Sequence, residues 1–335
     1  MKTPVIVLLL MTLSIYSCIG RIVIDKPGEF KITKEKYSFI QEYESPKDIH
    51  LTLSTVGGNI EVQGCEGNRV KVAFVVTKNN GEIIEMTLDE LKKYASFVIT
   101  KEGKELSIDV KEIFRRNMSV GFLVQTPVQT ACSISTSGGN LHVSGLTGNQ
   151  EMQTSGGNVD IEKVLGNVDA HTSGGNIYLE KLVGKTKVST SGGNIDSENL
   201  TGELNAETSG GNISLANHQG LADVSTSGGN INLENMTGSV SARTSGGNLY
   251  ADLKSLSDKL VLETNGGFIN CELPSDAGMN LELSAGDIKT TLNNFQGTSK
   301  SDYISGKING GGIPVQMSCP GGTLRLKFSK SSDNQ

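Results

Sequence analysis

One motif dominates this sequence: Thr-Ser-Gly-Gly-Asn followed by an aliphatic residue, as in Thr136–Leu141. Its asparagine recurs at one fixed interval, as Asn140, Asn158, Asn176, Asn194, Asn212, Asn230 and Asn248. The paired glycines are Gly138, Gly139, Gly156, Gly157, Gly174, Gly175, Gly192, Gly193, Gly210, Gly211, Gly228, Gly229, Gly246 and Gly247. A fixed period near 20 residues predicts a solenoid, in which each repeat buries its apolar face by stacking on its neighbours.

The residues between these motifs alternate with period two. Counting from each asparagine, positions +1, +3, +10, +12 and +14 carry apolar, small or threonine side chains, as Ile213, Leu215 and Thr226 illustrate. Such alternation predicts strands with one face inward. Each coil then has two strands and two glycine-bearing turns, where glycine would supply a positive φ. Parallel coils would stack about 4.8 Å apart, with threonine and asparagine ladders hydrogen-bonded along the axis.

The flanking segments differ from the repeats. We expect a β-rich region over 18–130 that contains a first coil around Asn59 and caps the solenoid. Thr87 and Glu90 have capping-box spacing, which predicts a short helix near 88–96. Residues 131–328 would form the solenoid with irregular C-terminal coils, and 329–335 a loose tail.

The N-terminus predicts export. Lys2 precedes the apolar run Val5–Met11, so residues 1–17 have the form of a signal peptide. Ile15–Cys18 resembles a bacterial lipobox, which implies cleavage before Cys18 and acylation of that cysteine. Several acyl chains would hold the protein on a membrane of the bacterial cell envelope, most simply the outer membrane. An ordinary secretory signal with an incidental cysteine is the alternative.

Composition narrows the possible partners. The net charge is −6 and the basic residues are scattered, which argues against nucleic-acid binding. Cys65, Cys132, Cys271 and Cys319 could form disulfides in an exported chain. The repeat register places Cys132 and Cys271 inward, so buried thiols are the alternative.

The repeats offer little catalytic or metal-binding chemistry. The Gly-Gly-Asn turns lack the aspartate of calcium-binding β-rolls and the lysine of phosphate loops, so we interpret them as structural. His142, His171 and His218 occupy different coil positions, so we expect no metal site, cofactor or catalytic residue. Outward carboxylates do form a stripe, interrupted by Ala216: Asp160, Glu162, Glu180, Asp196, Glu198, Glu234 and Asp252. This stripe is either a solvated face or a surface for a cation or basic partner.

The repeats resemble the bacterial putative adhesin families of Gly-rich β-solenoids, whose T-x-x-G-x-I coils follow a signal peptide. The resemblance covers about 50–328 and implies a right-handed single-stranded β-helix in the cell envelope, without catalytic residues. We therefore expect a non-catalytic lipoprotein whose rigid surface serves adhesion or the binding of a partner, such as an envelope polysaccharide or protein. The alternatives are a carbohydrate-active β-helix enzyme that uses the acidic stripe, and an accessory or sensor of the envelope-stress response.

Overall fold

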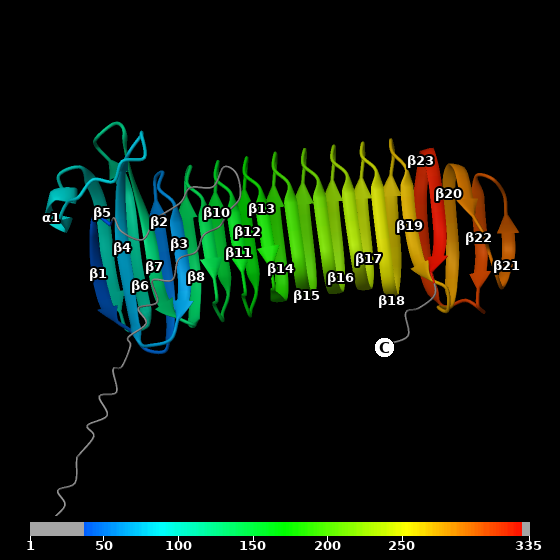
Figure 1. The fold of residues 1–335 in the computed structure, drawn as a ribbon, viewed down its shortest axis with the longest axis horizontal. Coiled ribbons are helices and arrows are strands. Elements are labelled where there is room, and N and C mark those ends of the chain that lie inside the picture. The colour runs from blue at the N-terminus through cyan, green and yellow to red at the C-terminus, as the bar shows by residue number, and fades with distance from the viewer. Residues whose placement is uncertain (1–36, 330–335) are drawn as a thin grey trace, which may run out of the picture. The chain divides into compact units, whose positions relative to one another are not determined.

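The computed structural model describes residues 37–329, which form an all-β structure with one short helix (Figure 1). The predicted signal peptide, Cys18 and most of the predicted C-terminal tail lie outside this range. Within it, no helix has the length and apolar character needed to cross a bilayer.

The repeats form a parallel stack of strands. Its strands are β8 (Gln129–Thr136), β9 (Leu141–Ser144), β10 (Gln150–Thr154), β11 (Val159–Glu162), β12 (Val168–Thr172), β13 (Ile177–Glu180), β14 (Val183–Thr190), β15 (Ile195–Thr208), β16 (Ile213–Thr226), β17 (Ile231–Thr244) and β18 (Leu249–Thr264). Ile195 pairs with Ile177 on one side and Ile213 on the other. Residues that pair in this part of the stack are therefore equivalent positions of consecutive repeats.

The core consists of the inward positions predicted from the alternation. In the coil that begins at Asn212, Ile213, Leu215, Val224 and Thr226 are all buried. Each inward side chain lies against its equivalent one coil away, which buries apolar surface continuously along the stack. The prediction of one inward face per strand is confirmed.

The Thr-Ser-Gly-Gly-Asn corners are joined by side-chain hydrogen bonds. The Thr208 hydroxyl donates to the Gly193 carbonyl of the preceding coil at 2.8 Å and accepts from the Gly211 N–H of its own corner at 3.2 Å. The Asn212 N–H donates to Asn194 Oδ1 at 2.8 Å. The Gly193 carbonyl and the N–H groups of Gly211 and Asn212 lie outside the strands, so these side chains satisfy them. The expected ladders exist, but they join side chains to backbone.

Glycine has a different role in each of the two turns. Gly184 has φ of 140°, as expected for glycine, and a Cβ there would lie 2.3 Å from the Gly166 carbonyl oxygen. Gly193 lies outside the positive-φ region, so the expectation of positive φ is wrong for this corner. A Cβ on Gly193 would lie 1.9 Å from the Gly175 carbonyl oxygen. Glycine is needed at Gly193 because successive backbones approach closely.

The described part of the N-terminal region forms a β-rich end of the stack. Its strands are β1 (Phe39–Glu44), β2 (Asp48–Thr55), β3 (Ile60–Cys65), β4 (Arg69–Lys78), β5 (Ala95–Glu102), β6 (Glu105–Ile113) and β7 (Met118–Pro127). β2 pairs in parallel with β6 and β8, and β3 with β7 and β9, so the coil around Asn59 stacks on the coil around Asn140. The antiparallel pairs β4–β7, β1–β4 and β5–β6 close this end (Figure 1).

The short helix α1 (Leu88–Leu91) has the predicted capping box between Thr87 and Glu90. It is shorter than the predicted 88–96, because Ala95 begins β5 and pairs with Ile113. Pairing within the sheet therefore ends the helix after one turn.

The C-terminal strands do not follow chain order along the stack. They are β19 (Ile269–Pro274), β20 (Met279–Thr290), β21 (Phe295–Ser299), β22 (Tyr303–Ile308) and β23 (Ile313–Ser329). β23 pairs in parallel with β18, β19 and β20, and so lies between the last repeat and β20 (Figure 1). The antiparallel strands β20, β22 and β21 close this end of the sheet.

Three cysteines of the stack are buried thiols. Cys132, Cys271 and Cys319 are 3% exposed or less and form no disulfide within the described range. Burial raises the pKa of the Cys132 and Cys271 thiols, which keeps them protonated and unreactive. For these three residues the buried-thiol alternative holds.

We predict that Gly193→Ala destabilises the stack and that Gly192→Ala does not. The Gly193 Cβ would meet the Gly175 carbonyl oxygen, whereas the nearest atom to a Gly192 Cβ is 3.8 Å away. Forcing the coils apart should lower the free energy of unfolding by about 1–3 kcal/mol. Thermal and urea unfolding followed by circular dichroism measure this difference. Equal melting temperatures for the two variants would contradict the close-approach argument.

We also predict a pH-dependent contribution to stability from His218, which occupies an inward position and is 2% exposed. Burial lowers the pKa of His218, and the Leu221 backbone opposes this in part. The unfolded chain therefore takes up a proton near pH 6.5 that the folded chain takes up only at lower pH, so stability falls as the pH drops below about 6.5. His218→Leu, which matches Leu200 one coil earlier, should lose less stability than the wild type between pH 8 and pH 5. Parallel curves of melting temperature against pH would refute this.

Candidate functional site

Five of the predicted carboxylates gather on the outward side of β11, β13 and β15. We call this set the acidic face: Asp160, Glu162, Glu180, Asp196 and Glu198. Glu180 lies beside Glu162 on one strand and Glu198 on the other. Neighbouring strands are about 4.8 Å apart, so these like charges repel unless a cation lies near them.

Nearby side chains compensate part of this charge. Lys181 forms an ion pair with Glu180, and Tyr178 Oη donates to Glu180 Oε2 at 3.4 Å. The hydrogen bond from Lys181 is the main reason that the pKa of Glu180 is lowered. Burial, then the charges of Glu180 and Glu198, raise the pKa of Tyr178 to about 12. Glu180 is therefore ionised and Tyr178 protonated at neutral pH.

Glu234 and Asp252, which the sequence placed in the same stripe, are separate from the acidic face. Ala216 on β16 lies between Glu198 and Glu234 in the register. Glu234 accepts a hydrogen bond from Asn232 at 2.8 Å, and Asp252 pairs with Lys254 at 2.8 Å. Local partners therefore engage both carboxylates.

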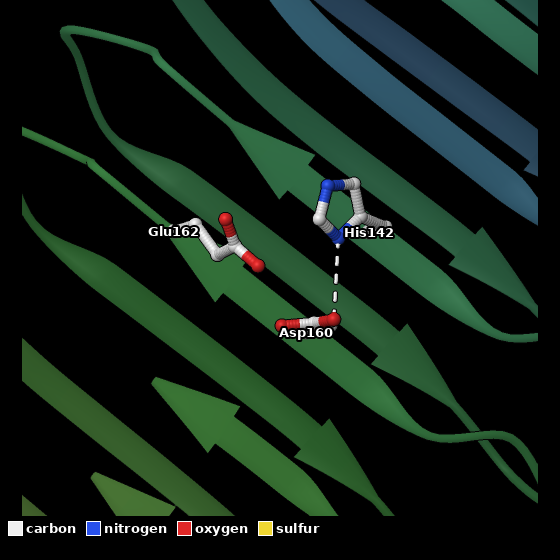
Figure 2. A group of neighbouring side chains, drawn as sticks. All are labelled: His142, Asp160 and Glu162. Atoms are coloured by element: carbon white, nitrogen blue, oxygen red, sulfur yellow. Dashed lines mark ion pairs between the residues drawn. The ribbon is translucent and has the colours of Figure 1, made fainter. Parts of the chain in front are cut away.

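A histidine adjoins the first strand of the acidic face (Figure 2). His142 on β9 pairs in register with Asp160 on β11, and His142 Nδ1 lies 3.4 Å from Asp160 Oδ2. Glu162 projects from the same side of β11, and one ligand atom from each of the three residues lies within 4.8 Å of the others. On the other side of His142, the register places Glu61 of β3.

This cluster is largely shielded from water. The side chains of His142 and Asp160 are 11% and 17% exposed. Burial alone would lower the pKa of His142, but the charges of Asp160, Glu61 and Glu162 outweigh it and raise that pKa. Burial raises the pKa of Glu61, with His142 opposing it. The cluster therefore favours a positive charge among its carboxylates.

The expectation that the histidines form no metal site rested on their different coil positions, and it missed this cluster. The structure does keep the histidines apart: His171 Nδ1 lies 2.9 Å from Ser189 Oγ, and His218 is in the core. The neighbours of His142 are carboxylates instead. His142 and Asp160 are one repeat apart and share coil position +2, so the repeat register already made them neighbours.

Comparison with known proteins finds a family match over part of the chain. The family model described as Toastrack DUF4097 matches residues 218–327, and no curated protein matches. A putative adhesin from Bacteroides fragilis is 13% identical with a TM-score of 0.34, over 86% of this chain and 96% of that chain. A putative lipid binding protein from Parabacteroides distasonis is 12% identical with a TM-score of 0.32, over 86% and 96%.

A putative cell adhesion protein from Clostridium sporogenes is 11% identical with a TM-score of 0.18, over 87% of this chain and 99% of that chain. These identities and TM-scores are too low to assign a function to this chain. The family match covers the later repeats and the C-terminal strands. Residues 218–327 are therefore similar to the Toastrack DUF4097 family, in agreement with the family resemblance that the repeats indicated.

Proposed function

We propose that this chain is a non-catalytic binding protein of the bacterial cell envelope whose acidic face binds a basic partner, either a protein segment or an amine-bearing envelope polysaccharide. The observation that carries the proposal is the file of Glu162, Glu180 and Glu198 on three consecutive paired strands. A parallel stack holds these charges at fixed spacing, so a partner with matching positive charges would lose little entropy on binding.

The proposal also covers the length and handedness of the coils and the roles of the two regions of the chain. We propose 18-residue coils that wind right-handed, because parallel strands in one sheet are almost always joined by right-handed connections. We also propose that residues 18–130 and 131–328 act as cap and binding solenoid. Both ends of the stack carry antiparallel strands, which fits a soluble display surface with closed ends.

A carbohydrate-active enzyme is the weaker alternative. Sugar-binding sites on β-helices use aromatic platforms, and the outward Tyr178 and Tyr250 are four repeats apart. Glycoside hydrolysis requires an acid and a second carboxylate on opposite sides of a scissile bond. The acidic face instead presents its carboxylates in parallel files on one surface.

We predict that Glu180→Gln with Glu198→Gln weakens binding of a fluorescent oligolysine peptide by about two- to thirtyfold, because two exposed ion pairs contribute about 0.4–2 kcal/mol. Fluorescence anisotropy at low salt measures this affinity. The matched control is Glu203→Gln with Glu207→Gln, which removes the same charge from β15 outside the acidic face. Equal affinities for the two double variants would refute the proposed surface, whereas unchanged melting temperatures would exclude misfolding.

We predict that Cys18→Ala moves the protein from the membrane fraction to the soluble fraction, because acyl chains on Cys18 would be its anchor. Fractionation of cells and metabolic labelling with a palmitate analogue measure both consequences. Ser17→Ala, which keeps a small residue before the cysteine, is the control and should stay anchored. Unchanged fractionation of Cys18→Ala would rule out the lipid anchor.

A further inference from the structure

Three side chains of metal-binding type meet where β9 and β11 run side by side (Figure 2). We infer that His142, Asp160 and Glu162 bind one divalent transition-metal ion of the Zn²⁺ class. This site shares Asp160 and Glu162 with the acidic face. The two proposals are still tested separately, because metal binding needs neither Glu180 nor Glu198 and is measured on the protein alone.

The spacing of the ligand atoms suits such an ion. His142 Nδ1 and Asp160 Oδ2 are 3.4 Å apart. Two ligands about 2.0–2.1 Å from a tetrahedral Zn²⁺ are separated by about 3.4 Å. The third ligand, Glu162, has an atom within 4.8 Å of both. Glu162 is partly exposed and has three rotatable bonds, so a small rotation brings its carboxylate to the same point.

The unsatisfied polar atoms of the cluster are a second and independent observation. His142 Nε2 and Asp160 Oδ1 are inaccessible to water and have no hydrogen-bond partner among the described residues. His142 Nδ1 is equally buried, and its contact with Asp160 Oδ2 is a long one at 3.4 Å. Buried polar atoms are seldom left without a partner, because the lost hydration costs about 1–3 kcal/mol per group. An ion between His142 and Asp160 would satisfy a ring nitrogen and a carboxylate oxygen together.

The surroundings favour a cation of this class. An imidazole with two carboxylates is a mixed ligand set typical of Zn²⁺ and its transition-metal neighbours, whereas Ca²⁺ and Mg²⁺ prefer oxygen ligands alone. Glu61, on the far side of His142 in the register, adds a third negative group. Metal-binding histidines commonly direct their other ring nitrogen at a carboxylate, and Glu61 is the candidate for that positioning role.

The local fold holds the ligands in place. Asp160 and Glu162 are alternate residues of β11 and so project from the same face, while Val159 and Ile161, the other alternate residues of this strand, are buried in the core. Parallel pairing fixes β9 against β11, with Leu141 opposite Val159 and Val143 opposite Ile161. Ligands on rigid strands lose little entropy when a metal binds.

The test is a titration of the purified chain with Zn²⁺ against a fluorescent chelator. We expect one equivalent to bind, and Glu162→Gln and His142→Gln each to weaken binding at least about tenfold, since even the loss of a supporting residue around a metal costs that much. Glu162→Gln preserves size on a partly exposed side chain, so it tests the ligand without disturbing the core. His171→Gln and Glu207→Gln are the controls and should bind as the wild type does.

Cobalt absorption gives a further readout. Co²⁺ bound by nitrogen and oxygen should show visible bands without the near-ultraviolet sulfur band that cysteine ligation would give. A stoichiometry below one Zn²⁺ per chain, or an equal loss of Zn²⁺ affinity in the control variants, would overturn the assignment. A sulfur band in the Co²⁺ spectrum would also overturn it, as would displacement of Zn²⁺ by a similar concentration of Ca²⁺ or Mg²⁺. Failure of Zn²⁺ binding would not contradict oligolysine binding, which is measured without metal on variants of Glu180 and Glu198. Failure of oligolysine binding would likewise not contradict Zn²⁺ binding.

Discussion

Contact between consecutive Thr-Ser-Gly-Gly-Asn corners is the constraint on which the stack depends. Each corner supplies a glycine carbonyl and an asparagine Oδ1 to the next coil, as Gly193 and Asn194 do for Thr208 and Asn212. These bonds satisfy backbone groups that no strand reaches. They also require the same spacing at every step, because a coil of another length would move its threonine away from the glycine carbonyl.

This constraint leaves the outward positions free to vary. Two strands of the acidic face, β11 and β13, have the buried aliphatic residues Ile161 and Leu179 at the same inward position, and β15 has the buried Ser197 there. Chemistry can therefore change on one surface without altering the core. Carboxylates on adjacent strands repel one another and lower the stability of the stack. Nearby cations, such as Lys181 beside Glu180, must therefore offset part of this repulsion.

The features that could be predicted are those encoded in the repeat or in a local motif, and the others depend on contacts between distant segments. The period of the motif determined the stack and its inward face, and Thr87 with Glu90 located the helix start. The motif around Asn59 predicted a first coil, and β2 does pair with β8. The pairing of β2 with β6 on its other side joins segments that share no repeat, and nothing local specifies it. The role of Gly193 depends on the approach of two backbones. The His142 cluster was accessible in principle, because the repeat register relates His142 to Asp160.

The place of β23 has a consequence for biosynthesis. The last described strand of the chain is an interior layer, with β18 and β19 on one side and β20 on the other. A chain that emerges from its N-terminus can add coils one by one as far as β18. The strands beyond β18 then keep unpaired edges until β23, the last described strand, has been synthesised. The C-terminal end of the sheet is therefore completed only after synthesis of the whole chain. A premature stop codon near Ile313 would remove β23 and so separate β20–β22 from β18 and β19.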